Sequence, residues 1–184
     1  MPSRPRNCFD KCSDVRILAW NVQGLDDDVL IDPIFINCLD NSDIVILTET
    51  WLEEPVNIQP TNFYTFNMLR PLRARAVRPS GGISILIRYE FRGKAGNGFK
   101  VIKEDDFSVW LKLCKEVLNI ERDIYVCGSY IPPIDSSFYK NREADPFSQL
   151  EQDINNFQKN GDVIMLGDLN APTAELQANF HKKE

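Results

Sequence analysis

The 184-residue sequence has no apolar run approaching the roughly 20 residues that a membrane-spanning helix needs, so no such helix is expected. Its N-terminal stretch, MPSRPRNCFDKCSD, carries charges but lacks an apolar segment, so it is not predicted to be a secretory signal. Internal repeats and low-complexity linkers are also missing. We therefore expect an intracellular protein, nuclear or cytoplasmic, with a flexible lead-in over residues 1–14 and one domain over residues 15–184.

Cysteine and histidine are scarce, with five Cys and one His. Three cysteines lie in apolar stretches and are expected to be reduced core residues: Cys38, Cys114 and Cys127. Cys8 and Cys12 form a closely spaced pair, but no second Cys pair accompanies them and His181 is remote in sequence. A zinc site is therefore not expected.

The net charge of -6 argues against a general nucleic-acid-binding protein, but the charges are unevenly distributed. Residues 55–103 carry nine Lys and Arg against one acidic residue and lie between two acidic blocks. The densest part of this basic block, RPLRARAVR, contains four arginines: Arg70, Arg73, Arg75 and Arg78. Two interpretations stay open, a surface that faces nucleic-acid phosphates and a solvated basic loop.

Short apolar runs predict strands and outnumber the helical patterns. The predicted strands cover residues 15–20, 43–50, 63–67, 81–88, 107–114, 123–131 and 162–168. One helix is predicted to begin near Pro33, and a second to have Asp145 as its N-cap, Pro146 at its first position and Gly161 as its C-terminal cap. Several strands are apolar throughout, which indicates that both faces are covered. We therefore predict an α/β fold of stacked sheets with helices outside.

Polar side chains lie at or just beyond the ends of four of the predicted strands. They are Asn21, Glu49, Tyr130 and the pair Asp168 and Asn170, which share one face because Leu169 lies between them. Carboxylate and amide oxygens without thiolate or imidazole suit a hard cation, Mg²⁺ or Mn²⁺, rather than zinc. Such a site supports phosphoester hydrolysis, in which a carboxylate orients or deprotonates the attacking water.

Each of these residues also has a purely structural interpretation. Asn21 would cap a turn, Glu49 would be an exposed carboxylate, and Tyr130 would be a core aromatic. Asp168 would cap the turn that follows its strand, and the adjacent glycines at 81–82 would serve backbone geometry. Their order and sequence contexts, taken together, favour a working site.

Five motifs occur in order between residues 17 and 171: ILAWNVQGL, DIVILTETWL, GGISILI, SYIPP and GDLNA. With these motifs the chain resembles the endonuclease/exonuclease/phosphatase family. It is most similar to the endonuclease domains of LINE-type (non-LTR) retrotransposons, which are similar to apurinic/apyrimidinic endonucleases. The resemblance implies a four-layer α/β sandwich of two packed mixed sheets with helices outside.

The resemblance also implies a role for each strand-end residue. Glu49 would be the principal Mg²⁺ ligand, and Asn21 would help to order the metal and phosphate. Asp168 would orient or activate the nucleophilic water, Asn170 would hold that water and the phosphate, and Tyr130 would hydrogen-bond the phosphate. From charge alone, we expect the loop with Arg70, Arg73, Arg75 and Arg78 to approach a DNA backbone.

The sequence departs from the family after GDLNA, because the further Asp and the Ser-Asp-His triplet of the family are not found. His181 lacks the preceding Ser-Asp and receives no catalytic role; Gln23 stands where several relatives carry an acid. We therefore expect a domain that lacks its C-terminal segment, and a DNA endonuclease that is weak or inactive. The alternatives are a catalytically dead nucleic-acid-binding remnant, or a related phosphoesterase acting on phosphoinositides, sphingomyelin or RNA tails. A longer reading frame would add a reverse transcriptase as partner.

Overall fold

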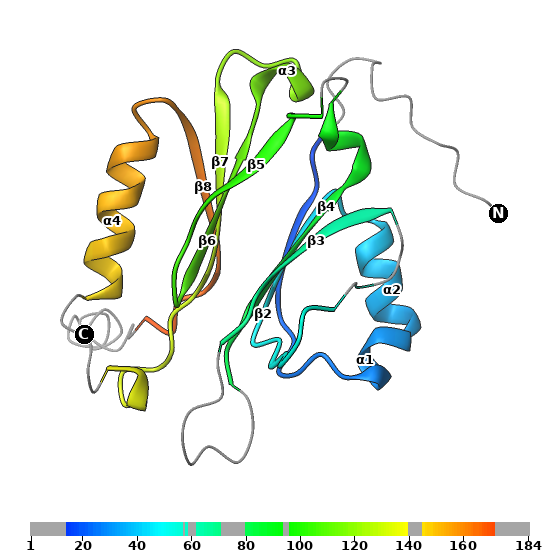
Figure 1. The fold of residues 1–184 in the computed structure, drawn as a ribbon, viewed down its shortest axis with the longest axis vertical. Coiled ribbons are helices and arrows are strands. Elements are labelled where there is room, and N and C mark those ends of the chain that lie inside the picture. Colours follow the sequence, from blue (N-terminus) through cyan, green and yellow to red (C-terminus); the bar gives the residue numbers. More distant parts are fainter. Residues whose placement is uncertain are drawn as a thin grey trace, which may run out of the picture.

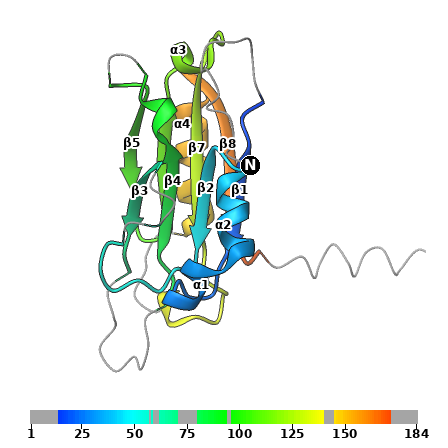
Figure 2. The same cartoon turned by 90° about the vertical axis from the view of Figure 1, so that its right-hand side faces the viewer.

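Two four-stranded sheets pack face to face, with helices on their outer faces (Figure 1, Figure 2). The computed structural model describes residues 14–56, 58, 62–70, 80–93, 96–139 and 145–171. Helices α1 and α2 lie outside the first sheet and α4 lies outside the second. The predicted α/β fold of stacked mixed sheets between helix layers is therefore confirmed.

The first sheet has the strand order β1-β2-β4-β3, in which only β1 and β2 are parallel. Its strands are β1 (Ile17–Asn21), β2 (Ile44–Thr48), β3 (Phe63–Met68) and β4 (Ile83–Arg88). The second sheet has the order β5-β6-β7-β8, in which only β7 and β8 are parallel. Its strands are β5 (Phe99–Glu104), β6 (Ser108–Leu113), β7 (Asp123–Tyr130) and β8 (Gly161–Asp168). The helices are α1 (Asp27–Ile31), α2 (Pro33–Asp40), α3 (Lys115–Leu118) and α4 (Pro146–Phe157), with 3₁₀ turns η1 (Tyr89–Arg92) and η2 (Ser137–Tyr139).

The helix boundaries agree with the sequence pattern at two points and differ at two. Asp145 caps α4 by accepting a hydrogen bond from the Ser148 backbone, and Pro146 follows it as predicted. The stretch around Pro33 forms two helices, because Asp26 and Asp32 each cap a separate one. The prediction that Gly161 caps α4 is wrong: the helix ends at Phe157, and Gly161 opens β8.

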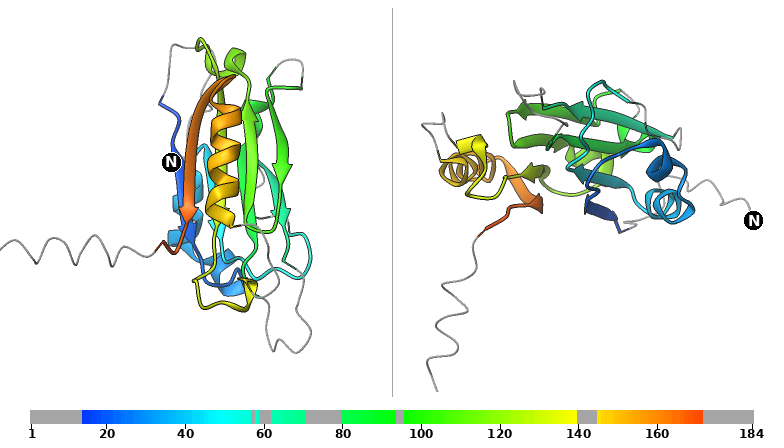
Figure 3. Two further views of the ribbon diagram at one scale, coloured as in Figure 1. Left: turned by 90° about the vertical axis from the view of Figure 1, so that its left-hand side faces the viewer. Right: turned by 90° about the horizontal axis from the view of Figure 1, so that it is seen from below.

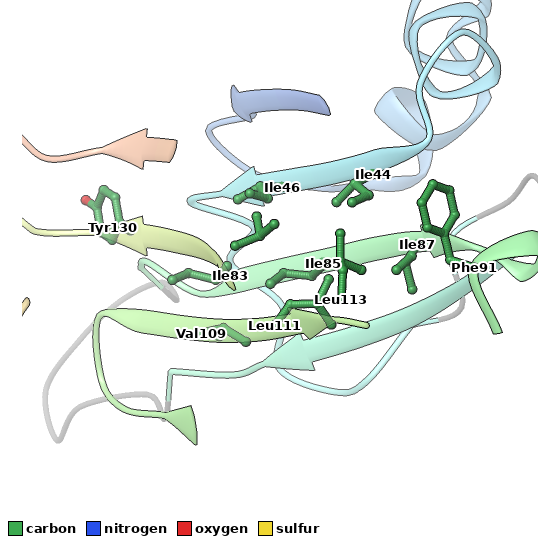
Figure 4. Packing of buried hydrophobic residues seen from close by; sticks show 11 residues of the cluster. Ile44, Ile46, Ile83, Ile85, Ile87, Phe91, Val109, Leu111, Leu113 and Tyr130 are labelled. Carbon is green, nitrogen blue, oxygen red and sulfur yellow. The ribbon is translucent and has the colours of Figure 1, made fainter. Parts of the chain in front are cut away.

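The main core lies between the two sheets (Figure 4). Ile44 and Ile46 of β2 face the second sheet, whereas Val45 and Leu47 face the α1–α2 layer, so both faces of this strand are buried. The sheets approach closely at Gly128 of β7, where an added Cβ would lie 2.8 Å from Ile46 Cγ2. Side-chain volume at this contact therefore sets the spacing between the sheets.

The prediction that three cysteines are reduced core residues is confirmed in full only for Cys127. Cys38, Cys114 and Cys127 are all free thiols, but only Cys127 is buried and the other two are partly exposed. Cys8, Cys12 and His181 lie outside the described residues. Within the described part of the chain, no helix is both long enough and apolar enough to cross a bilayer.

Strands β1 and β8 form the adjacent edges of the two sheets. Each pairs with only one neighbour in the described part of the chain, and the two strands lie side by side (Figure 3). Their apolar side chains are mostly half-buried, and Trp20 is 36% exposed. β1 and β8 therefore have apolar sequences typical of strands that are covered on both faces, although each lies at the edge of its sheet.

Arg88 at the end of β4 closes the C-terminus of α2. Its Nε donates to the Ser42 carbonyl at 2.7 Å and its Nη2 to the Asp40 carbonyl at 2.5 Å. Its guanidinium also lies 4.7 Å from the Phe63 ring centre. Backbone carbonyls left by the helix end thereby gain charged donors.

We expect Arg88→Ala to lower the free energy of unfolding by about 2 kcal/mol, because the part-buried Ser42 carbonyl and the exposed Asp40 carbonyl lose charged hydrogen-bond donors. Urea denaturation followed by circular dichroism measures this change. The control is Arg92→Ala, an exposed arginine in the next turn, for which a change within about 0.5 kcal/mol is expected. Equal effects of the two substitutions would contradict the capping role.

Candidate active site

The carboxyl ends of four strands meet at one end of the molecule. The parallel pair β1 and β2 is in register with Asn21 opposite Thr48, so Asn21 and Glu49 leave the first sheet together. The parallel pair β7 and β8 is in register with Tyr130 opposite Asp168. Because both parallel pairs end at the same side, residues far apart in sequence converge there.

Asn21 links the two sheets at this end. Its Nδ2 donates to Glu49 Oε1 at 3.2 Å and to Asp168 Oδ2 at 2.8 Å. The orientation of the amide is fixed from the other side, where the Gln23 backbone N–H donates to Asn21 Oδ1 at 3.2 Å. Two carboxylates from opposite sheets are thus held around one amide nitrogen, an arrangement that a turn cap would not require.

The backbone after β2 is strained at Glu49. Its φ is 53°, in the left-handed region that residues with side chains seldom adopt. Trp51 has a φ of 54° and donates its backbone N–H to the Gly81 carbonyl at 3.0 Å. Gln23 and Asn170 also have positive φ values, so four such residues flank the same site. Strain of this kind is concentrated at functional sites, where surrounding contacts hold it.

The end of β8 is equally constrained. Gly167 has a φ of 137°, and a Cβ built on it would lie 1.9 Å from the Ser129 carbonyl oxygen, so no side chain fits. The Asn170 backbone N–H donates to Asp168 Oδ1 at 3.1 Å, and its side-chain amide donates to the Ile131 carbonyl at 3.0 Å. Asn170 therefore fixes both Asp168 and the segment after β7, and its contact with substrate stays a prediction.

Tyr130 lies at the end of the inter-sheet core and is 7% exposed (Figure 4). Burial raises the pKa of its phenol above the ordinary 10.0, and the hydrogen bond to Glu49 and the charges of Glu49 and Asp168 raise it further. The nearby Arg70 guanidinium acts in the opposite direction on this pKa. Tyr130 is therefore a neutral phenol at physiological pH and donates to the Glu49 carboxylate.

Because the folded-state pKa of Tyr130 is above the unfolded value of 10.0, its contribution to stability is complete below pH 10 and is lost as the pH rises through the folded-state pKa. We expect a late component from Tyr130, above pH 10, in a titration followed by tyrosinate absorbance. Tyr130→Phe should remove that late component. If Tyr130→Phe instead removes an ordinary component, the burial argument fails.

Arg70 joins the site from the end of β3. Its guanidinium carbon lies 5.5 Å from the Tyr130 ring centre and 5.0 Å from that of Phe138, and Nη2 donates to the Asp106 carbonyl at 2.8 Å. A Cβ on Gly81 would lie 2.6 Å from Arg70 Nη1, so glycine is needed for this packing. The glycine pair thus serves geometry, as expected. No local sequence pattern indicates the aromatic contacts of Arg70, because Phe138 is remote along the chain.

The other arginines of the basic block, Arg73, Arg75 and Arg78, lie outside the described residues. Six residues of the predicted set do come together in the structure: Asn21, Glu49, Tyr130, Asp168, Asn170 and Arg70. Their donor atoms are carboxylate, amide and phenol oxygens, together with nitrogens that donate hydrogen bonds. This chemistry fits a hard cation held largely by Glu49 with water and phosphate oxygens, and it does not fit zinc.

A second group of metal-ligand types, Cys114, Glu116 and Asp123, lies at the opposite end of the second sheet. Lys112 Nζ contacts Asp123 at 2.7 Å, and this hydrogen bond lowers the pKa of the Asp123 carboxyl. Burial raises the pKa of the Cys114 thiol, which disfavours the thiolate that a metal would need. An ion pair accounts for this group without a metal.

Comparison with known proteins gives one family match and several structural neighbours. The sequence model of the Endonuclease/Exonuclease/phosphatase family matches residues 18–182, and no curated protein sequence matches. The structure is similar to the human Nocturnin catalytic domain (16% identity, TM-score 0.55, 92% of this chain and 69% of that chain). It is also similar to Caenorhabditis elegans TDP2, with 16% identity and a TM-score of 0.56 over 88% of this chain and 48% of that chain. A third similar structure is the Xenopus laevis APE2 catalytic domain, with 19% identity and a TM-score of 0.58 over 85% of this chain and 59% of that chain. The chain thus spans about half to two thirds of these structures, and at such identities the likeness establishes the fold.

Proposed function

Because the chain belongs to the endonuclease/exonuclease/phosphatase family, we propose that it hydrolyses phosphodiester bonds of DNA, as an endonuclease of the LINE retrotransposon type. The observation that carries this proposal is the convergence of Glu49 and Asp168 on the Asn21 amide from opposite sheets. The motifs TETWL and GDLNA, at the ends of β2 and β8, support the retrotransposon type.

Enzymes of this family typically depend on a divalent metal. Glu49 would hold Mg²⁺ or Mn²⁺, which when bound supplies positive charge that stabilises the phosphate oxygens during hydrolysis. The Tyr130 hydrogen bond orients the Glu49 carboxylate, and the Asn21 amide keeps Glu49 and Asp168 near each other despite their like charges.

In this proposal Asp168 acts on the attacking water. Hydrogen bonds from Asn21 and Asn170 fix both of its oxygens, so the carboxylate has a defined direction. In the proposed reaction the carboxylate accepts a proton from water as the water oxygen bonds to phosphorus. The bond between phosphorus and the leaving sugar oxygen breaks, that oxygen takes a proton from solvent water, and Asp168 returns its proton to solvent.

The proposal is tested by nicking of supercoiled plasmid DNA in Mg²⁺, with EDTA and the Asp168→Asn variant as controls. Mg²⁺-dependent nicking that both controls abolish would support it. If the chain binds DNA but gives no nicking in Mg²⁺ or Mn²⁺ above that of the variant, the phosphodiesterase proposal is wrong.

A nucleic-acid-binding chain without turnover is the second candidate, and the open edges of β1 and β8 favour it. Asn21 and Asp168 lie at the ends of these two strands, each of which has one neighbour among the described residues. Catalysis requires side chains held tightly in place, and a strand paired on one side holds its end less firmly. Binding without nicking in the plasmid assay would identify this candidate.

We propose that Arg70 contributes to DNA binding by contacting a phosphate beside the site. Its side chain is held against Tyr130 and Phe138, so little side-chain entropy is lost on binding. Arg70→Gln is expected to weaken duplex DNA binding about tenfold at low salt and to reduce the slope of log K against log salt by about one. Fluorescence anisotropy over a range of salt concentrations measures both quantities.

Arg92→Gln is the matched control for the lost charge. Arg92 is exposed in η1, and its substitution changes the net charge by the same amount. It should leave the salt slope nearly unchanged. An unchanged slope for Arg70→Gln as well would show that Arg70 only supports the packing of Tyr130 and Phe138.

A further inference from the structure

The chain that follows β1 and the chain that follows β2 stay hydrogen-bonded beyond the ends of both strands. Val22 donates its backbone N–H to the Thr48 carbonyl at 3.0 Å. Gly24 then donates to the Glu49 carbonyl at 2.8 Å, and the next residue donates to the carbonyl that follows Glu49. The segment that carries Asn21 and the segment that carries Glu49 are therefore held as one unit.

This unit concentrates unfavourable backbone conformations. The φ values of Gln23, Glu49 and Trp51 are 51°, 53° and 54°, and that of Gly24 is 108°. Three of these four residues have side chains, for which the left-handed region is costly. Such a conformation persists only where surrounding contacts hold it, so the contacts of this unit decide where the Glu49 carboxylate lies.

The Trp51 indole makes the closest of these contacts. A Cβ built on Gly24 would lie 2.8 Å from Trp51 Cε3 and 3.1 Å from Cζ3, so the six-membered ring rests against the Gly24 backbone. The Trp51 backbone N–H donates to the Gly81 carbonyl at 3.0 Å, which anchors the other side of the residue. Trp51 thus holds Gly24, the residue whose N–H binds the Glu49 carbonyl.

We propose that Trp51 is a positioning residue, which fixes the Glu49 carboxylate for a divalent metal by packing on Gly24. This inference rests on the proposed function and specifies which residue outside the site orders the metal ligand. Without the indole, Gly24 is free to move and the Glu49 backbone relaxes out of the left-handed region. Residues that orient a metal ligand without touching the metal contribute about 10- to 100-fold to metal affinity.

The test measures Mn²⁺ binding to the chain by electron paramagnetic resonance of the free ion, without DNA. We expect Trp51→Ala to raise the Mn²⁺ dissociation constant about tenfold or more. Trp51→Phe keeps an aromatic ring beside Gly24 and should restore most of the affinity. The matched control is Trp20→Ala, because Trp20 lies on β1 and packs against Phe35 instead, with ring centres 5.8 Å apart. It should keep the native affinity, and thermal denaturation shows whether each variant is folded.

Gly24→Ala disturbs the same contact from its other side. The added Cβ would push the Trp51 ring away, so this variant should also bind Mn²⁺ more weakly. Because both substitutions disrupt one contact, the loss in the double variant should be smaller than the product of the two single losses. If Trp51→Ala does not fold, Gly24→Ala and Trp51→Phe decide the question.

Native affinity in folded Trp51→Ala or in Gly24→Ala would overturn the positioning role, as would an equal loss in Trp20→Ala. A native chain that binds no Mn²⁺ would overturn it too. Hydrolysis of bis(p-nitrophenyl) phosphate tests the phosphodiesterase proposal separately. Mn²⁺ binding that depends on Trp51 without hydrolysis removes only the phosphodiesterase, whereas hydrolysis with unchanged affinity in Trp51→Ala removes only the positioning role.

Discussion

Replacing Asp168 by Asn is expected to lower the rate of phosphodiester hydrolysis by about 10²–10⁴-fold, the usual contribution of a general base. The substitution keeps the shape of the side chain but removes the charge and the proton acceptor. The carboxylate now accepts hydrogen bonds from Asn21 at 2.8 Å and from the Asn170 backbone at 3.1 Å. An amide has only one oxygen, so one of these donors also loses its acceptor.

The measurement is the initial rate of plasmid nicking in Mg²⁺, with thermal denaturation of each variant to confirm folding. Asp162→Asn is the control, because Asp162 lies on the same strand and pairs with Arg122 at the surface, where its side chain is 61% exposed. The control should keep the native rate. If both variants nick at the native rate, Asp168 is a structural carboxylate and the proposed mechanism is wrong.

The second large effect is expected for Gly167→Ala, which should lower the free energy of unfolding by about 3 kcal/mol or more. A Cβ at this position would lie 1.9 Å from the Ser129 carbonyl oxygen, and the φ of 137° is unfavourable for any side chain. Relief of the clash requires β7 and β8 to separate where they pair Tyr130 with Asp168. Nicking should therefore fall as well, even in conditions where the variant is folded.

Urea denaturation provides the stability measurement for Gly167→Ala. The matched control is Gly96→Ala, since Gly96 also has a positive φ, of 76°, but its nearest neighbour to an added Cβ is Arg92 Nε at 3.5 Å. That substitution should cost about 1 kcal/mol, from backbone strain alone. A Gly167→Ala effect no larger than that of Gly96→Ala would show that the close approach of the strands is readily relieved.

The layers of the fold and the meeting of the strand ends were predictable from the sequence. Continuous apolar runs such as residues 44–47 are buried on both faces, and the polar residues that follow them, Asn21, Glu49 and Asp168, leave parallel strands at the same end. Strand periodicity suffices for the buried strands, whereas the meeting of their polar ends was inferred from the order of the motifs, because parallel pairing joins remote segments.

Other features depended on contacts that no local pattern reports. Strand β5 was not predicted, because its FKVIKE sequence mixes apolar and charged residues at a sheet edge. The left-handed backbone of Glu49 is maintained by its surroundings rather than by its own preference. The position of Arg70 requires Gly81 and Phe138, and no periodicity links these three residues.

The close contact between Gly128 and Ile46 has a consequence for the chemistry. Asn21 belongs to one sheet and Asp168 to the other, so the 2.8 Å hydrogen bond between them spans the gap that the core side chains fill. The thickness of the hydrophobic core therefore helps to set the separation of Asn21 and Asp168 in the candidate active site. Substitutions that change the volume of core side chains would therefore be selected against for lost activity as well as for lost stability. Selection for activity would extend to interior residues that do not contact substrate.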